Sequence, residues 1–286
     1  MLAISIEVIA FYSIAGIVIF LNKQKGLIAM EKTYLERLFG LGGKTVLITG
    51  AGRGIGQIVA LGFAKAGATV AIFSRTGADE TVKEIEEAGG KAFSFVVDVV
   101  DEMQVNQGLS DVLETCGSID VVFNNAGICI HKDTFLASID DWRKVLDINL
   151  TGQYIVARAA GKIMKDLGTK GAIINMASMS GTTVNVPQWQ ASYNASKAGV
   201  IHMTRSLAVE WAQYGIRVNS ISPGYINTPM SADTPQELRD AWMPLIPQYR
   251  MGEAEELIPA LLYLASDAAG YTTGSDVVVD GGYSCR

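Results

Sequence analysis

Short hydrophobic runs rich in β-branched residues alternate with segments of helix length from Lys44 to the C-terminus, and this alternation constrains the fold more than any other feature. The runs are almost continuously apolar, which indicates strands buried on both faces. They are TVLIT (45–49), TVAIF (69–73), AFSFVV (92–97), DVVFN (120–124), GAIINM (171–176), IRVNSI (216–221) and DVVVD (276–280). We therefore expect an α/β fold, a single Rossmann-type domain whose doubly wound parallel sheet carries helices on both faces.

The first 29 residues differ from the rest. They are apolar except at three positions between residues 2 and 21, and Lys23 and Lys25 follow. This length just meets the roughly 20 residues of a spanning helix, and the two lysines would leave the following domain in the cytoplasm. A secretory signal fits poorly, because no positive region precedes the apolar run. The alternatives are a membrane anchor and a non-native extension with translation starting at Met30. The domain itself is expected to span residues 30–286.

Charge and composition exclude several functions. The net charge is -6 and no block of Lys or Arg is present, so we expect no nucleic-acid partner. The three cysteines lack C-x-x-C spacing, which favours a reducing compartment and a cytoplasmic protein. His131 and His202 lie far apart without cysteine partners, so no metal-ligand set is visible.

A glycine-rich turn follows the first expected strand, in TGAGRGIG at residues 49–56. Ile55 stands where G-x-G-x-x-G requires its third glycine, and no Lys-Ser/Thr follows as in a Walker A motif. The spacing that remains is that of Gly50, Gly54 and Gly56. A strand that turns this sharply into a helix can bring its backbone to a pyrophosphate, or it can be a packing feature alone.

The end of the second expected strand indicates which dinucleotide would bind. An acidic residue there typically binds the ribose hydroxyls of NAD(H), whereas an arginine accommodates the 2′-phosphate of NADP(H). Here the strand ends in Ser74 and Arg75, and no acid follows until Asp79. Arg53 in the glycine turn is a second candidate cation, or an ordinary solvated turn residue. We therefore predict NADP(H) in preference to NAD(H).

Tyr193 and Lys197 lie four residues apart in SYNASKAG, so on a helix they share one face. A tyrosine is almost wholly protonated at neutral pH, and lowering its pKa by about 3 units needs about 4 kcal/mol of preferential phenolate stabilisation. A cation one helical turn away, helped by the positive nicotinamide ring of an oxidised cofactor, can supply that by charge attraction. The pair is thus a candidate proton-transfer centre.

These motifs occur together with NNAG (124–127), DINL, SMSG and PGYINT (223–228), and the chain resembles the short-chain dehydrogenase/reductase family from about Lys44 to its end. The resemblance implies that Tyr193 is the general acid/base, Lys197 its activator, Ser178 the hydroxyl that orients the carbonyl, and Asn149 the anchor of a water-linked proton path. Ser180 competes for the serine role, but Ser178 lies three residues before Gly181, as the family pattern requires. The implied NAD(P) contacts are Gly50, Arg53, Gly54, Ile55, Gly56, Ser74, Arg75, Asp98, Asn124, Gly127, Tyr193, Lys197, Pro223, Gly224, Ile226 and Thr228.

The substrate is expected to be a small ketone or secondary alcohol. The segment between Ser178 and Tyr193 is enlarged and carries Asn185, Gln188, Trp189 and Gln190, which suit a hydroxyl-rich ligand. Together with SPGYINTPM, this loop resembles the branch that acts on polyols and keto-sugars. Residues 224–256 lack strand character and are expected to cover the pocket, with Trp242 and Met243 as candidate walls. His131, just after NNAGICI, either borders the same pocket or is an ordinary loop histidine, and we favour the second interpretation.

Three alternatives stay open from the sequence. A 3-oxoacyl thioester reductase would need a basic surface for an acidic carrier, and this acidic chain offers little sign of one. A non-catalytic NADP(H) sensor would be expected to lack a catalytic residue, whereas all four are present. A membrane-tethered structural role would rest on residues 1–29 alone. The family resemblance implies a homotetramer, with VVVDGGYSCR near a subunit contact.

Overall fold

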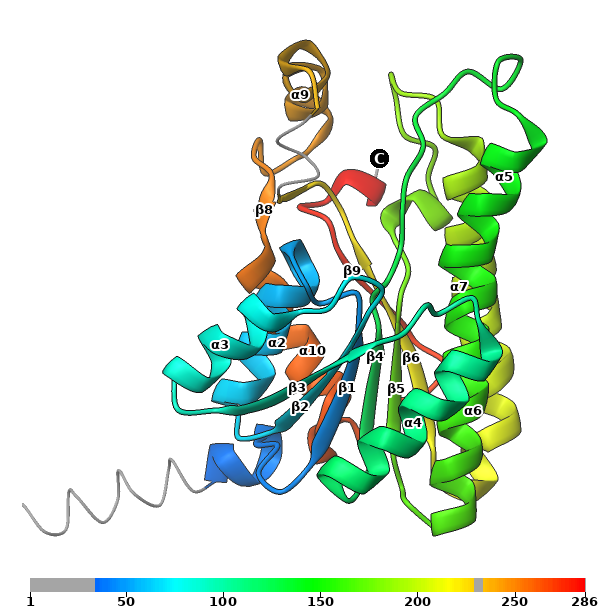
Figure 1. Cartoon of the computed structure of the whole chain (residues 1–286). Coiled ribbons are helices and arrows are strands. Elements are labelled where there is room, and N and C mark those ends of the chain that lie inside the picture. Colours follow the sequence, from blue (N-terminus) through cyan, green and yellow to red (C-terminus); the bar gives the residue numbers. More distant parts are fainter. Residues whose placement is uncertain (1–33, 229–233, 286) are drawn as a thin grey trace, which may run out of the picture.

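A computed structural model describes residues 34–228 and 234–285. Within this part of the chain a seven-stranded parallel sheet runs through the molecule in the order β3-β2-β1-β4-β5-β6-β9 (Figure 1). Its strands confirm the seven expected runs to within two residues at each end. They are β1 (Thr45–Thr49), β2 (Thr69–Ser74), β3 (Lys91–Val96), β4 (Val121–Asn124), β5 (Ala172–Met176), β6 (Arg217–Pro223) and β9 (Asp276–Val279). The α/β fold class is therefore confirmed.

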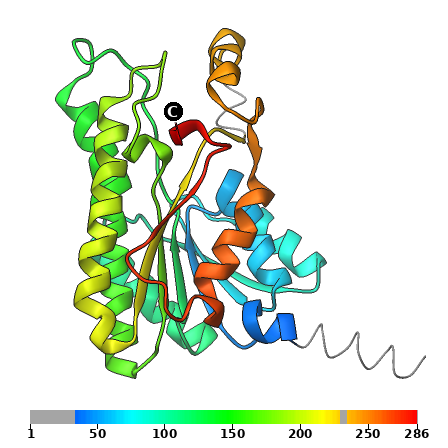
Figure 2. The same cartoon turned by 180° about the vertical axis from the view of Figure 1, so that it is seen from behind.

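The apolar runs form strands because both faces of the sheet are covered. Along β1, Val46 and Ile48 pack into the hydrophobic cluster on one face, while Leu47 between them packs into the cluster on the other. Figures 1 and 2 show one layer of helices on each face. The first layer holds α2 (Gly54–Lys65), α3 (Asp79–Glu87) and α10 (Ile258–Ala265), and the second holds α4 (Glu102–Cys116), α5 (Ile139–Leu146), α6 (Gly152–Leu167) and α7 (Ala191–Trp211).

Local signals set several helix ends. The Asp101 carboxylate caps α4 by accepting hydrogen bonds from two backbone N–H groups, and Gly117 ends that helix at φ 85°. Ser138 and Asp141 form a reciprocal capping box at the start of α5. The second of these caps fixes the start of the helix that leads into the turn carrying Asn149.

The sheet order brings two distant loops to one place. Strands β1 and β4 are neighbours, but the chain leaves β1 toward one edge of the sheet and β4 toward the other. Their carboxyl ends therefore form a topological switch point, where α/β proteins typically bind ligands. The glycine turn follows β1 there and the NNAG segment follows β4.

The segment at 224–256 differs from its prediction in one respect. Two short strands, β7 (Ile226–Asn227) and β8 (Gly252–Glu253), pair in parallel, although the sequence indicated no strand there. A two-residue pair arises where distant extended segments meet, which leaves no periodic signal. Between them, α9 (Gln236–Trp242) and the 3-10 turn η4 (Met243–Leu245) stand above the sheet (Figure 1).

The expected extension at residues 1–29 lies outside the described residues, and so do residues 30–33 of the expected domain. Within the described ranges, none of the helices combines the length and the apolar character that crossing a membrane requires.

Candidate active site

The four candidate catalytic side chains come from three neighbouring elements. Helix α7 carries Tyr193 and Lys197 on one face, with the Lys197 Nζ 5.4 Å from the centre of the tyrosine ring. Ser178 follows β5 and caps a short 3-10 turn, η2 (Met179–Gly181). Asn149 lies in a π-turn, η1 (Asp147–Thr151), that joins α5 to α6.

Lys197 is buried, with 2% of its surface exposed. Its Nζ donates a hydrogen bond of 2.7 Å to the carbonyl oxygen of Met176, which also accepts one from the Gln153 side chain. Burial is the main cause that lowers the pKa of Lys197 to about 8, and the nearby Cys129 opposes it. The lysine is therefore held in place by backbone, and its charge is costly there.

The pKa of the Tyr193 hydroxyl is raised above that of an ordinary tyrosine. Burial is the main cause, the Cys129 thiol adds to the rise, and a hydrogen bond with Ser178 lowers it. The predicted lowering is a joint effect of Lys197 and a nicotinamide ring, and Lys197 alone does not offset burial here. The positive nicotinamide ring of a bound oxidised coenzyme is the further cation that a phenolate would need.

Asn149 is fully buried and joined to backbone at both ends of its amide. Its Oδ1 accepts from the N–H of Ile128 at 2.8 Å, and its Nδ2 donates to the carbonyl of Ile128 at 2.9 Å and to the hydroxyl of Ser196 at 3.1 Å. The π-turn directs the side chain inward, and such turns are frequent at functional sites. Asn149 thus fixes the loop after β4 against α7.

The two competing serines lie together. The Ser178 hydroxyl donates to that of Ser180 at 3.1 Å, and the N–H of Ser180 donates back to the Ser178 oxygen at 3.1 Å. The hydrogen bond of Tyr193 is with Ser178. The geometry therefore favours Ser178 as the serine beside the proton donor.

The glycine turn has the shape of a phosphate cradle. Helix α2 begins at Gly54, within the described chain no side chain caps its first turn, and that turn has no acidic residue. A side chain at Gly54 would meet nothing within 4 Å, whereas one at Gly50 would come 2.9 Å from the backbone of Ala126. Bare N–H groups facing open space suit an anionic pyrophosphate. The residues present therefore fit a dinucleotide.

The NNAG segment is arranged differently from its prediction. Asn124 lies at the end of β4, but its side chain points into the core and donates to Asn175 at 3.0 Å. The next residue, Asn125, donates to the carbonyl oxygens of Thr49 and Gly50 at 3.0 Å each and so holds the glycine turn. The sequence did not single out Asn125. Two asparagines stand together at the end of the strand, and the sequence pattern does not say which of them faces the core.

Gly127 lies between two catalytic side chains. A Cβ there would be 3.2 Å from the Asn149 Oδ1 and 3.7 Å from the Lys197 Nζ. Further along the same edge, Asp98 partly faces solvent and its carboxylate accepts from the N–H of Val100. Only a small residue fits at position 127 without displacing Asn149.

The candidate contacts for a 2′-phosphate lie beside the glycine turn. A side chain at Gly52 would approach the carbonyl of Gly77 and the hydroxyl of Ser74, so the turn and the end of β2 are adjacent. Arg53 and Arg75 are both exposed, and neither forms an ion pair with another described residue. Two uncompensated guanidinium groups favour a phosphate over a bare ribose.

The loop after β6 lies at the same edge of the sheet, on the remaining side of the candidate cofactor site. Gly224 packs so closely on the next strand end that a Cβ would be 2.7 Å from the Cα of Asp280. Pro223 ends β6, Ile226 is buried in the core through β7, and Thr228 is partly exposed. The backbone at this loop, more than its side chains, is therefore available to a cofactor.

The amides that are candidates for substrate contact form hydrogen bonds within the protein. Asn185, Gln188 and Gln190 are all buried, whereas Trp189 is 60% exposed. Trp242 is also buried, and its ring stacks on Tyr225 with centres 4.0 Å apart. The exposed His131 lies in hydrogen-bond contact with Gln190, while partial burial of its ring lowers its pKa.

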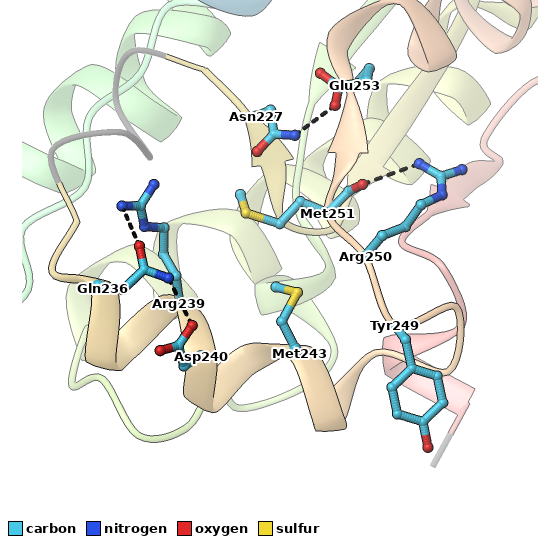
Figure 3. Close-up of a pocket in the computed structure, with 9 residues that line it drawn as sticks. All are labelled: Asn227, Gln236, Arg239, Asp240, Met243, Tyr249, Arg250, Met251 and Glu253. Carbon is cyan, nitrogen blue, oxygen red and sulfur yellow. Dashed lines mark hydrogen bonds between the residues drawn. The ribbon is translucent and has the colours of Figure 1, made fainter.

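A separate pocket of about 360 Å³ lies between α9 and the β7–β8 pair (Figure 3). Met243 lines it together with the polar side chains of Asn227, Gln236, Arg239 and others. None of the four catalytic candidates lines it. This pocket is therefore distinct from the space above Tyr193.

Cys129 is a site residue that the sequence analysis missed. Burial raises the pKa of its thiol to about 12, and the charge of Lys197 acts against this. Its position two residues after Gly127 was the available signal. All three cysteines are free, and the described residues contain no cluster of three or more His, Cys, Asp or Glu side chains able to hold a metal.

Comparisons with known proteins agree with this geometry. A family model described as enoyl-(acyl carrier protein) reductase matches residues 50–284. Sorbose reductase of Candida albicans is 43% identical over 87% of this chain and 89% of its own length. A probable NADP-dependent mannitol dehydrogenase of Yarrowia lipolytica is also 43% identical, over 90% of this chain and 92% of its own. A crystal structure of a short-chain type dehydrogenase/reductase from Mycobacterium marinum superposes with a TM-score of 0.85 at 44% identity, covering 87% of this chain and 98% of that one.

Proposed function

The chain belongs to the short-chain dehydrogenase/reductase family, and from this membership we propose that it is an NADP(H)-dependent oxidoreductase that interconverts a keto-sugar and a polyol. The observation that carries the proposal is the convergence of Tyr193, Lys197 and Ser178 beside a bare helix N-terminus. The names of the relatives, a sorbose reductase and a mannitol dehydrogenase, support the substrate class.

The geometry favours a simple division of roles. NADPH, when bound, supplies a hydride to the carbonyl carbon. Tyr193 donates its hydroxyl proton to the carbonyl oxygen, and its raised pKa keeps it in the protonated form that reduction needs. Ser178 hydrogen-bonds the same oxygen and fixes its position. In the oxidative direction Tyr193 accepts the proton of the alcohol.

Lys197 and Asn149 act on the donor and its surroundings. The Lys197 ammonium lies over the Tyr193 ring and favours the phenolate left after proton transfer. Asn149 holds the backbone of Ile128 on both its N–H and its C=O, which keeps the Gly127 loop clear of the reacting groups. We assign the coenzyme phosphate to Arg75 and Arg53, because both are exposed next to the turn.

We further propose that residues 30–286 are the NAD(P)-binding catalytic unit and that it works in the cytoplasm as a homotetramer. Three free cysteines agree with a reducing compartment. Membrane contact is proposed only in the case that residues 1–29 form an anchor.

The test is NADPH oxidation, followed at 340 nm, over a panel of ketoses, diketones and 3-oxoacyl thioesters. We expect turnover with ketoses, and we expect Tyr193→Phe to lower it by at least about 10³-fold while NADPH still binds. Tyr214→Phe, which makes the same change in the 3-10 turn η3 (Ala212–Tyr214) that follows α7, is the matched control.

Other results would redirect the proposal. Turnover confined to thioesters would replace the keto-sugar by an acyl substrate, in line with the acyl carrier protein in the description of the family model. Tight NADPH binding without turnover of any carbonyl would indicate a sensor.

A further inference from the structure

A continuous series of side-chain hydrogen bonds begins at the catalytic serine. The Ser178 hydroxyl meets that of Ser180 at 3.1 Å, and the Ser180 oxygen accepts from the Gln190 Nε2 at 3.3 Å. The same Nε2 donates to the Asn185 Oδ1 at 3.1 Å and to the Asn194 Oδ1 at 2.9 Å. Gln190 is therefore the point where the serine pair joins the enlarged loop.

The series continues to α9. The Tyr225 hydroxyl oxygen accepts from the Asn185 Nδ2 at 3.1 Å and from the Gln188 Nε2 at 2.7 Å. The Gln188 Oε1 in turn accepts from the indole N–H of Trp242 at 3.0 Å. Trp242 is the last residue of α9, so the helix is bonded through side chains to the serine pair.

Because these side chains are buried, losing one of their hydrogen bonds is costly. Ser178, Ser180, Asn185, Gln188, Gln190 and Trp242 are all less than 9% exposed. Water therefore has little access to replace a lost partner, and a broken link leaves a buried polar group unsatisfied. A sequence that needed only packing here would use apolar side chains.

We infer that Gln190 and Tyr225 are positioning residues. They hold the Ser180 hydroxyl, and through it the Ser178 hydroxyl, at a fixed position relative to α9. This inference rests on the proposed function, because it assigns Ser178 the contact with the carbonyl oxygen. Ser178 carries one proton and can donate it either to Ser180 or to the substrate. When it donates to the substrate, its oxygen can accept from the Ser180 hydroxyl, whose own oxygen is already held by the Gln190 amide. The chain of donors then ends at the reacting oxygen.

A double-mutant cycle on the full chain tests the coupling. Tyr225→Phe keeps the ring stack on Trp242 and removes the oxygen that accepts two amide hydrogens. We expect it to lower kcat roughly tenfold with an unchanged KM for NADPH, and to have less than about a threefold effect once Ser180→Ala is present. Tyr214→Phe, at an aromatic residue remote from the chain of hydrogen bonds, should show neither effect. Trp242→Phe, which keeps an aromatic ring but loses the N–H donor and part of the ring volume, provides the same cycle from the other end if Tyr225→Phe does not fold.

Three results would overturn the inference. Independent, multiplying effects of Tyr225→Phe and Ser180→Ala on kcat would show that the two ends are not coupled. An unchanged kcat in Tyr225→Phe would do the same. A Ser180→Ala protein as inactive as Ser178→Ala would assign the substrate contact to Ser180 itself.

Coupling is reciprocal, which gives a readout that needs no substrate. Ser180→Ala should speed amide hydrogen exchange in α9, although the two lie on different elements. Equal exchange in α9 of the wild type and Ser180→Ala would contradict the inference, whatever the enzyme reduces. If the wild type reduces thioesters and not ketoses, the proposed substrate class fails, and the cycle is run with the thioester.

Discussion

The buried charge of Lys197 serves the proposed reaction but lowers the stability of the fold. Its pKa is about 8 in the folded protein against 10.5 for an ordinary lysine, so between these values the unfolded chain binds more protons. The free energy of unfolding therefore rises with pH across this window, and the full cost of burying the charge is present below pH 8. That cost is at most about 3 kcal/mol.

Lys197→Met should remove this cost and the reaction together. We expect the free energy of unfolding at pH 7 to increase, by up to about 3 kcal/mol, because Met176 keeps its hydrogen bond from Gln153. Turnover should fall by at least about 10³-fold. Urea unfolding at pH 7 and pH 10 measures both the gain in the free energy of unfolding and the loss of its pH dependence. The exposed Lys144→Met is the control. A less stable Lys197→Met protein at pH 7 would contradict the argument.

Coenzyme choice also belongs to single residues. Arg75→Ala should raise the Kd of NADPH by about 10-fold to 100-fold and leave that of NADH unchanged, because only the former carries a 2′-phosphate. Fluorescence titration with both coenzymes measures this, and Arg143→Ala, at an exposed position on α5, is the matched control. Equal losses for NADPH and NADH would mean that Arg75 does not bind the phosphate.

At this scale the sequence could place residues along the chain but not their partners in space. The four-residue spacing of Tyr193 and Lys197 predicts a shared helix face, and α7 has it. The spacing does not report how deeply the pair is buried, and burial raises the pKa of the tyrosine, against the attraction of the lysine. Likewise Asn185 and Gln190 were interpreted as substrate contacts because their amides bind hydroxyls, and in the fold those amides meet one another.

At the scale of elements, the site depends on two loops and a π-turn that touch. The loop after β4 passes Asn149 so closely that Gly127→Ala would place a methyl group 3.2 Å from the Asn149 Oδ1. We expect the amide to shift and its bond to the N–H of Ile128 to weaken, which should lower kcat about tenfold or more and the free energy of unfolding by about 1–2 kcal/mol.

A matched glycine makes this prediction specific. Gly42→Ala meets nothing within 4 Å, and its backbone lies outside the left-handed region, so it should leave activity and stability nearly unchanged. Steady-state kinetics and thermal unfolding of the two variants provide the comparison. Equal kcat values in Gly127→Ala and Gly42→Ala would show that catalysis does not depend on the space between the Gly127 loop and Asn149.

The elements were also where the sequence was most informative. The seven apolar runs form seven strands. A strand that is apolar on both sides must be buried on both faces, and a parallel sheet covered by the intervening helices provides that burial. The β7–β8 pair is different, because two residues carry no period and their pairing joins segments that lie far apart in the sequence. Cys129 was missed for a similar reason: its position two residues after Gly127 was a signal, but the local sequence does not indicate that Lys197 of α7 lies close to it.

At the scale of the whole molecule, the core and the site lie within one contiguous part of the chain. Leu41 is fully buried and its backbone bonds to Ala66, while Tyr283 is buried near the other end. Every residue assigned above to catalysis or coenzyme binding falls between Gly50 and Thr228. The proposed catalytic unit at 30–286 contains all of them.

A protein that begins at Met30 should therefore have the kcat, NADPH affinity and unfolding midpoint of the full chain, within about twofold for the first two and about 2 °C for the last. Both proteins are compared by the 340 nm assay and by light scattering, where we expect a tetramer from each. Membrane flotation separates the remaining alternatives, because an anchor would carry only the full chain to the vesicles. A lower kcat in the shorter protein would mean that residues 1–29 contribute to the site, and the proposed boundary at Met30 would then be wrong.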